Sequence, residues 1–595
     1  MIEALLPLLK STFGFDNFRG VQDQVLARVM NGHNTLAIMP TGSGKSLCYQ
    51  LPAIANDGTV IVISPLIALM HDQLRSAEAV GIRAATLTSA DDNRAETIAR
   101  LKAGELDLLY AAPERASQPH FRELLEQTNI SLFAIDEAHC VSEWGHDFRP
   151  DYRLLQPLLD HFHTVPRLAL TATADRHTRG DILIQLGIEQ DGLILAGFDR
   201  PNIRYSISPR KGLTGQIKDL VERHSGSGIV YAQTRNATEK LADQISKTGR
   251  SARAYHAGLP PEIRQQNQAD FVASEDMIMV ATIAFGMGID KPDVRFVAHA
   301  GLPKSIEAYY QETGRAGRDG DPAEAHLFWG AEDFARARQR LGEVDQERQD
   351  SERQRLSSLG GLVETAECRR AILLKHFGEK PPEKCGNCDN CLNSPLTRNV
   401  TELARKFLSA VYRTGQSFGV THLEAVLTGR QEEKILSRGH DKLSVFDIVG
   451  EEEAALIKPV SRHLLLKDAL RNTEHGGLMF GPEARPILKG ELEVDIVEPP
   501  KRERKRRRNG SSPNPVGDPL FDALRAKRME LSKEQGVPPY VIFHDSVLRD
   551  MTGFKPRTLS ALSELPGIGA AKLDKYGTTF LEVIQTVGEA QQESV

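Results

Sequence analysis

Two stretches of the chain alternate short apolar runs with amphipathic segments, a pattern typical of parallel α/β sheets. The apolar runs predict strands at 35–38, 60–63, 106–110, 132–135 and 167–170, and then at 228–231, 277–280 and 294–297. Strands this apolar are buried on both faces, and the polar segments between them fit covering helices. The pattern therefore predicts an α/β fold with two parallel-sheet domains in series, over residues 1–198 and 199–336.

The pattern changes after residue 336. Residues 337–396 begin with a charged helical stretch and end in a cysteine cluster, and residues 397–490 predict a small helical domain with a terminal strand pair. Residues 491–515 combine Pro-Pro, the run KRERKRRR and Asn-Gly-Ser-Ser-Pro, a composition that predicts a basic flexible linker. Helical periodicity returns in residues 516–595 and predicts a separate small all-α domain.

Composition narrows the class of protein without identifying it. The chain has 595 residues, enough for about four domains, with 40% hydrophobic and 26% charged residues, as in ordinary globular proteins. No apolar run approaches the ~18 residues that span a bilayer, and the N-terminus lacks the basic start of a secretory signal. We therefore expect a cytoplasmic protein with no membrane partner. The net charge of −6 means that any nucleic-acid surface must be local.

A phosphate-binding loop follows the first predicted strand. Residues 39–46 read MPTGSGKS, in which Met39 replaces the first glycine of the usual pattern. The loop backbone can cradle phosphates, the Lys45 ammonium can meet the β and γ oxygens, and the Ser46 hydroxyl can bind Mg²⁺. Alone, such a loop could be a chance turn. The candidate nucleotide-binding residues of this loop are Thr41, Gly42, Ser43, Gly44, Lys45 and Ser46.

A pair of carboxylates follows another predicted strand. The string Asp-Glu-Ala-His begins at Asp136, directly after the apolar run 132–135. Asp136 can hold Mg²⁺, and Glu137 can orient or deprotonate an attacking water. Both motifs fall at the carboxyl ends of strands, where α/β sheets bind their ligands. The two motifs together predict nucleoside triphosphate hydrolysis.

The second α/β domain carries a glycine-rich string with two arginines. Residues 309–318 read YYQETGRAGR, and we expect Arg315 and Arg318 on neighbouring turns of a helix. Exposed arginines are usually only solvated. In this string they can instead stabilise charge on the transferring γ-phosphoryl group from across a cleft.

Four of the six cysteines are clustered. Cys368, Cys385, Cys388 and Cys391 follow the spacing C-x16-C-x2-C-x2-C. Four thiolates suit tetrahedral zinc, and in a chain without an export signal a metal site is favoured over disulfides. An iron–sulfur cluster and a redox or free-thiol cluster remain alternatives.

These motifs together resemble a superfamily 2 helicase core, and in particular the RecQ family of DNA helicases of bacterial type. Residues 15–22, FDNFRGVQ, resemble the family's adenine-reading motif. The resemblance implies that Gln22 bonds the adenine edge, with Phe15 stacking and Arg19 in support.

Residues 140–152 directly follow the Asp-Glu-Ala-His box and resemble the aromatic-rich loop that couples single-stranded DNA to ATP hydrolysis. Trp144 could alternatively be an ordinary core aromatic. The residues to which the resemblance assigns the coupling are Trp144, His146, Phe148 and Arg149.

The resemblance also covers the C-terminal part of the chain. It implies two RecA-like domains, then a structural zinc-binding subdomain (337–396), a winged helix that binds duplex DNA (397–490), and, beyond the 491–515 linker, an all-α HRDC domain (516–595). In the last domain, a Gly-Ile-Gly turn at 567–569 could bind phosphate or simply join two helices.

The resemblance implies an ATP-dependent DNA helicase of recombination and repair that moves 3′ to 5′ along single-stranded DNA and unwinds duplex or branched DNA. Its cofactors would be ATP, Mg²⁺ and Zn²⁺, its location the bacterial cytoplasm near the nucleoid, and its candidate protein partners single-strand-binding protein and other repair proteins. Two alternatives remain open, an RNA helicase and a DNA-binding scaffold with an inactive ATPase.

Overall fold

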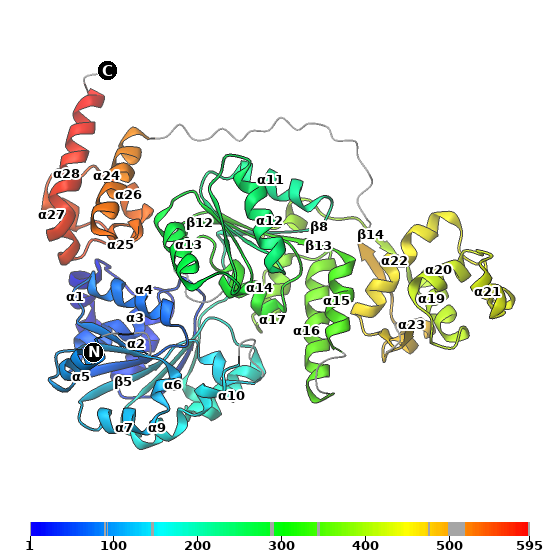
Figure 1. The fold of residues 1–595 in the computed structure, drawn as a ribbon, viewed down its shortest axis with the longest axis horizontal. Coiled ribbons are helices and arrows are strands. Elements are labelled where there is room, and N and C mark those ends of the chain that lie inside the picture. The colour runs from blue at the N-terminus through cyan, green and yellow to red at the C-terminus, as the bar shows by residue number, and fades with distance from the viewer. Residues whose placement is uncertain are drawn as a thin grey trace.

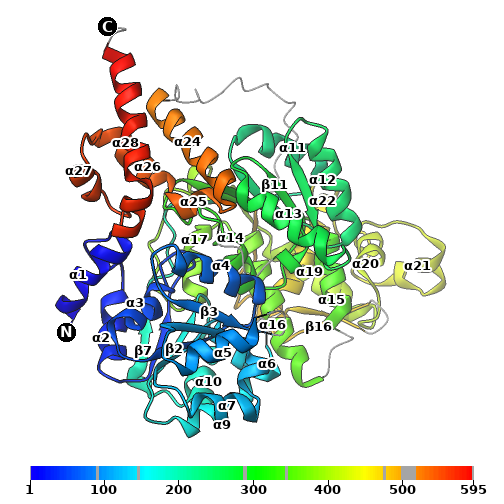
Figure 2. The same cartoon turned by 60° about the vertical axis from the view of Figure 1, so that its left-hand side comes forward.

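The computed structural model places two α/β domains side by side, with a helical module on either flank (Figures 1 and 2). The first α/β domain is blue to cyan and the second is green. The yellow module lies at one end, and the orange and red C-terminal helices lie beside α1 at the other. The structure describes residues 2–88, 91, 93–143, 148–285, 291–341, 346–473, 477–497 and 518–592.

The first domain is built on a parallel seven-stranded sheet with the order β3-β4-β2-β5-β6-β1-β7. The central strands are buried on both faces, as their continuous apolar runs predict. The strands are β1 (Thr35–Ile38), β2 (Thr59–Ile63), β3 (Ala84–Leu87), β4 (Leu108–Ala111), β5 (Ile130–Ile135), β6 (Arg167–Thr171) and β7 (Leu193–Leu195).

Helices cover both faces of this sheet. The amphipathic N-terminal helix α1 buries Leu5 and Leu9 against α2 and α3. The helices of the first domain are α1 (Ile2–Phe13), α2 (Gln22–Met30), α3 (Leu47–Ala55), α4 (Ile67–Glu78), α5 (Arg94–Lys102), α6 (Pro113–Ala116), α7 (Pro119–Leu125), α8 (Pro150–Arg153), α9 (Gln156–His161) and α10 (Arg176–Leu186), with the 3₁₀ turns η1 (Ala138–Val141) and η2 (Gln190–Gly192).

The second domain has a parallel six-stranded sheet with the order β10-β11-β9-β12-β13-β8. Its strands are β8 (Ile203–Pro209), β9 (Ser227–Tyr231), β10 (Ala252–Tyr255), β11 (Ile278–Ala281), β12 (Val294–His299) and β13 (Ala323–Trp329). Its helices are α11 (Leu213–Arg223), α12 (Arg235–Ser246), α13 (Pro261–Ala273) and α14 (Ile306–Thr313), with the 3₁₀ turn η3 (Ile283–Phe285).

Three smaller units follow the second sheet. The first holds the four cysteines and comprises α15 (Ala331–Leu341), α16 (Gln346–Glu364), α17 (Arg369–His376) and α18 (Asp389–Leu392). The second has its own apolar core and comprises β14 (Thr397–Asn399), α19 (Thr401–Arg413), α20 (Val420–Leu427), α21 (Glu433–Ser437), η4 (His440–Lys442), α22 (Glu451–Leu466), β15 (Leu470–Asn472), β16 (Leu478–Phe480), α23 (Ala484–Lys489) and β17 (Asp495–Val497).

The third unit is the C-terminal helical domain, which encloses a separate core centred on Phe543 and Phe580. Its helices are α24 (Pro519–Gln535), α25 (Pro539–Ile542), α26 (Asp545–Phe554), α27 (Leu559–Ser563) and α28 (Ala570–Gln592). None of the helices in the described part of the chain is long and apolar enough to cross a membrane.

The predicted strands are present, with small shifts in their ends. The run expected at 106–110, for example, forms β4 two residues later, because Leu106 and Asp107 precede the paired segment. The sequence pattern missed β3, β7, β8, β10 and β13. Four of these, β3, β7, β8 and β10, are edge strands, and partial exposure weakens the apolar signal of β7, β8 and β10. The strand pair expected before residue 490 is the β15–β16 hairpin.

Candidate active site

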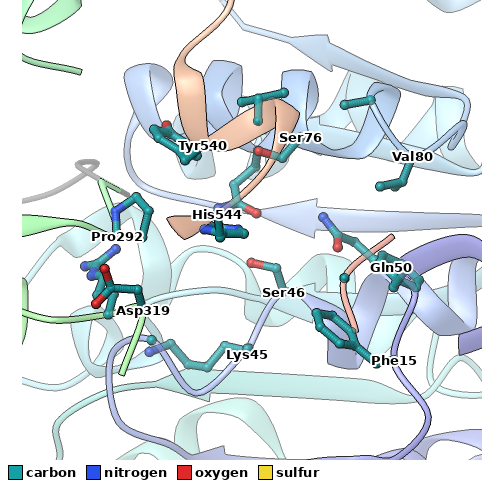
Figure 3. Close-up of a pocket in the computed structure, with 18 of the residues that line it drawn as sticks. Phe15, Lys45, Ser46, Gln50, Ser76, Val80, Pro292, Asp319, Tyr540 and His544 are labelled. Atoms are coloured by element: carbon teal, nitrogen blue, oxygen red, sulfur yellow. The ribbon is translucent and has the colours of Figure 1, made fainter. Parts of the chain in front are cut away.

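The phosphate-binding loop connects the end of β1 to the start of α3 (Figure 3). Gly44 has a φ of +78°, and a β-carbon there would lie 2.5 Å from Nε2 of Gln22, so a side chain would be both strained and blocked. The Lys45 ammonium donates to the backbone oxygens of Met39 at 3.2 Å and Pro40 at 3.5 Å. The lysine is thus held over the loop that is expected to receive phosphate.

The two carboxylates lie at the carboxyl end of β5. The Asp136 amide donates to the carbonyl of Ile63 on the neighbouring strand at 2.9 Å, which fixes its position. The buried Tyr152 hydroxyl donates to the Asp136 carbonyl at 2.8 Å, and burial raises the pKa of Tyr152 well above its ordinary value, so this donor stays protonated.

Glu137 is held in an unusual backbone conformation. Its φ is +48°, a left-handed value that a side chain rarely adopts and that occurs at functional sites when neighbours enforce it. Its carboxylate Oε2 lies 3.3 Å from Nδ1 of the fully buried His139. The same His139 nitrogen lies 2.9 Å from Oγ1 of Thr171, at the end of β6. Glu137 is therefore connected through His139 to the next strand of the sheet.

The second domain brings two arginines to the same place. Arg315 and Arg318 do not lie on neighbouring helical turns, and that prediction was wrong: α14 ends at Thr313, and both follow it in a turn where Gly317 has a φ of +57°. Glycines at 314 and 317 favour this early end, because they destabilise a continued helix. A β-carbon on Gly42 would lie 3.3 Å from Arg318, so this turn touches the phosphate-binding loop across the domain boundary.

Arg200 joins the two domains at this point and was missed from the sequence. Its guanidinium donates to the Thr41 carbonyl of the phosphate-binding loop at 2.7 Å. It also donates to the carbonyls of Gly314, Ala316 and Gly317 in the arginine turn, at 3.2, 2.9 and 2.9 Å. The only signal in the sequence was its place at the junction of the two α/β patterns.

A cavity of about 650 Å³ opens where these parts meet, a size typical of small-molecule sites. Figure 3 shows Lys45 and Ser46 on one side and Phe15 at one end. The structure thus brings together most of the predicted nucleotide residues from both domains. Those that line the cavity are Phe15, Arg19, Thr41, Gly42, Gly44, Lys45, Ser46, Asp136, Glu137, Arg315 and Arg318.

Two predicted nucleotide residues, Gln22 and Ser43, lie behind the cavity wall. The Gln22 amide donates to the carbonyls of Ser43 and Gly44 at 3.0 and 3.2 Å, and its Oε1 accepts from the Arg19 amide at 2.9 Å. The Ser43 hydroxyl donates to Pro40 at 2.7 Å. In this conformation Gln22 braces the loop and would have to leave these bonds to reach a base.

The aromatic-rich loop is described in part. Trp144 and His146 lie outside the described residues. Phe148 lies beneath the Arg153 guanidinium, 5.3 Å from it, and the Arg149 guanidinium donates to the carbonyl of Pro65 at 2.9 Å. Pro65 follows β2, next to the strand that carries Asp136, so Arg149 ties this loop to the carboxylate end of the sheet.

The four cysteines converge as the spacing predicted. Their sulfur atoms all lie within 4.8 Å of one another, with Cys368 and Cys388 at 3.9 Å and Cys385 and Cys391 at 3.9 Å. A tetrahedral ion with ~2.3 Å bonds requires sulfur atoms about 3.8 Å apart, so the cluster fits zinc.

The loop that carries the last three cysteines is attached to the second sheet. Asp389 accepts from the Ile207 amide of β8 at 2.9 Å and pairs with Arg369 at 3.1 Å. The rings of Phe377 and Phe198 stack with centroids 4.6 Å apart. The unit that holds the cysteines is therefore attached to β8 of the second domain and, through Phe198, to the end of the first domain.

Five family models match successive parts of the chain. They are the DEAD/DEAH box helicase (19–181), the helicase conserved C-terminal domain (213–320), the RecQ zinc-binding domain (331–392), the RQC domain (394–505) and the HRDC domain (518–584).

Relatives of similar length match almost the whole chain. The chain is 40% identical to the ATP-dependent DNA helicase RecQ of Haemophilus influenzae over 592 residues, which covers 98% of this chain and 95% of the relative. It is 38% identical to the protein of the same name from Bacillus subtilis over 594 residues, which covers 98% and 99%.

Proposed function

This chain belongs to the RecQ family of ATP-dependent DNA helicases, and we propose that its hydrolysis of ATP takes place in the cavity between the two α/β domains. The observation that carries this assignment is the joint lining of one cavity by Lys45, Asp136 and Glu137 of the first domain and by Arg315 and Arg318 of the second.

In this proposal the first domain binds the phosphates and the second completes the site. Lys45 and the loop backbone hold the triphosphate, and Glu137 orients and deprotonates water. Ser46 and Asp136 would hold Mg²⁺, which neutralises phosphate charge when bound. Arg315 and Arg318 meet the charge that develops on the γ-phosphoryl group.

At the other end of the cavity, Phe15 and Arg19 receive the base. The Arg19 guanidinium lies 5.0 Å from the centre of the Phe15 ring, which holds the ring in place for stacking. Gln22 supports this end through its bonds to Arg19 and the loop. Adenine recognition by Gln22 itself remains the prediction made from the sequence.

The protein binds DNA, and we propose that residues 140–152 sense it. Arg149 links this loop to Pro65, and His139 links the box before it to Thr171. A bound DNA strand that moves this loop can therefore change the position of Glu137. We also propose 3′-to-5′ movement, action on duplex and branched DNA, residence in the bacterial cytoplasm at the nucleoid, and association with single-strand-binding protein.

The two arginines provide the test, because they belong to the second domain. Arg315→Ala and Arg318→Ala should each retain nucleotide binding while ATP hydrolysis and strand separation fall by about 100-fold. Hydrolysis near the wild-type level in both variants would contradict the shared site. Stimulation of the wild-type ATPase by single-stranded DNA and by RNA should be compared in the same assay, since a preference for RNA would contradict the proposed substrate.

A further inference from the structure

The C-terminal helical domain closes the nucleotide cavity from a third side. The cavity is lined by Tyr540, His544 and Lys572 as well as by the two α/β domains. Figure 3 shows Tyr540 and His544 across the cavity from Lys45 and Ser46. In the sequence, the Gly-Ile-Gly turn at 567–569 suggested phosphate binding by this domain, but no motif assigned His544 or Lys572 to the nucleotide site.

On the first domain, the C-terminal domain docks directly beside the base end of the cavity. The Gly567 amide donates to the Gly14 carbonyl at 2.7 Å, one residue before Phe15. Gly14 has a φ of +73°, and a β-carbon there would lie 2.4 Å from the Ile568 nitrogen, so only glycine permits this approach. Lys10 pairs with Glu564 at 3.3 Å at the edge of the same contact.

On the second domain, Asp321 pairs with Arg549, and Glu275 contacts two arginines of the C-terminal domain. Glu275 accepts from Arg528 at 2.7 Å and pairs with Arg525, both on α24. Arg528 is 3% exposed and also binds the Phe543 carbonyl at 2.8 Å and Asp545 at 2.7 Å. These two residues flank His544. The arginine that docks the domain on Glu275 therefore also sets the position of His544 in the cavity.

The groups that this domain presents suit a phosphorylated ligand. Lys572 brings a cation to the cavity wall, and its ammonium nitrogen lies 5.9 Å from the centre of the Phe543 ring. Burial lowers the pKa of Lys572 to about 8, so an anion in the cavity would favour its charged form. His544 adds an imidazole on the side facing Ser46. With the domain in place, the cavity has a volume of about 650 Å³, enough to hold a ligand without ejecting the domain.

We infer that the C-terminal helical domain is a third wall of the nucleotide site, and that a bound nucleoside triphosphate contacts His544 and Lys572. This inference rests on the proposed nucleotide site. Because the domain is attached to both α/β domains, its docking depends both on the bound ligand and on the relative position of those two domains. Nucleotide binding and docking of the domain must then strengthen each other by the same factor.

The docking contact can be broken without touching the cavity. In Glu275→Arg, the new cation faces Arg525 and Arg528 and should release the domain. Glu262→Arg is the matched control, because Glu262 is an exposed glutamate in the first turn of the preceding helix α13. Docking can be followed by hydrogen–deuterium exchange of residues 564–569, which include the amide bonded to Gly14.

The affinity for a non-hydrolysable ATP analogue, measured without DNA, then tests the inference. We expect binding to be at least about 5-fold weaker in Glu275→Arg, His544→Ala and Lys572→Met. The control Glu262→Arg should bind the analogue with wild-type affinity. The analogue should slow exchange at 564–569 in the wild-type protein. Faster exchange on adding the analogue would overturn the inference, because the domain would then be a plug that the nucleotide expels.

The remaining outcomes are also decisive. Unchanged exchange in Glu275→Arg would show that the domain does not dock through this contact in solution, and unchanged affinity in the three variants would show that it does not contact the nucleotide. Lys45→Ala separates a failure of the third wall from a failure of the proposed nucleotide site. If Lys45→Ala weakens binding and the three variants do not, only the third wall fails; if Lys45→Ala has no effect either, the proposed nucleotide site fails.

Discussion

The cysteine cluster takes all four of its side chains from residues 368–391, whereas the nucleotide cavity takes its lining from three domains spread over most of the chain. The first site is closed and is built by one short unit fixed to β8. The second site exists only while separate domains hold their positions. A local site of this kind stabilises the fold, and a distributed one can respond to motion. Substitutions in the cysteine cluster should therefore lower stability, whereas substitutions in the nucleotide cavity should lower activity.

The largest expected effect is the loss of the metal cluster. Cys388→Ala removes a fully buried ligand, and structural zinc contributes on the order of 10 kcal/mol to such units. We expect less than one zinc per chain and protease sensitivity over residues 360–395. Cys140→Ala, which also truncates a buried cysteine but lies outside the cluster, should keep its zinc. Iron, or no metal, in fresh wild-type protein would contradict the assignment.

The next effect is confined to activity. In Lys45→Ala, loss of a point charge on the phosphates should lower ATP hydrolysis by about 100-fold and abolish unwinding. DNA binding and the melting temperature should stay near the wild-type values, because Lys45 contacts loop carbonyls and not the apolar core. Lys102→Ala, an exposed lysine of the same domain, is the control. Activity above about a tenth of wild type would rule out this role.

A smaller effect should appear in the coupling between DNA binding and ATP hydrolysis. Trp144→Ala and Arg149→Ala should keep ATP binding and most of their affinity for single strands, since one lost base stack costs ~1–3 kcal/mol. Both should lose most of their stimulation by DNA, because hydrolysis depends on DNA only if the loop has two positions. ATPase titrations with DNA measure this effect. A large fall in melting temperature for Trp144→Ala would instead identify it as a core residue.

The smallest effect concerns the basic run at 501–508, which lies outside the described residues. It carries seven positive side chains and one negative, a net charge of +6. If about three of these charges neutralise phosphates, replacing the run with a neutral segment should reduce the log–log salt slope on single strands by roughly 2. That equals ~16-fold in affinity over a fourfold change in salt. An unchanged slope would leave the run as a spacer only.

Much of the first domain could be predicted because its signals are local. The apolar runs at 35–38 and 132–135 end in the phosphate-binding loop and in Asp136, and the folded sheet places both at the same edge. The cysteine spacing likewise predicted the cluster, since three of its ligands lie within one short loop. In each case neighbouring residues in the sequence determine the geometry that the chemistry needs.

The arginine turn and the third wall show where local signals end. The string at 309–318 was expected to be helical as far as Arg318, but α14 ends at Thr313, and only the fold places the following turn against Gly42. No local sequence pattern marks Arg200 as a domain link or Gln22 as a support for the loop. Both roles come from hydrogen bonds to carbonyls of the phosphate-binding loop, which only the fold brings close. Such partners are not visible in a pattern of hydrophobic and polar positions.

By itself, the sequence determined the order of the domains, the two parallel sheets, the phosphate-binding loop, the carboxylate pair and the cysteine cluster. It could do so because strand periodicity and short motifs depend on residues that are close along the chain. The tertiary structure alone decided that Arg200 joins the two domains, that Gln22 braces the loop, and that His544 and Lys572 reach the nucleotide cavity. The Gln22 contact spans 21 positions of the sequence and the Arg200 contact to Thr41 spans 159, and both depend on how separate segments pack in the folded protein.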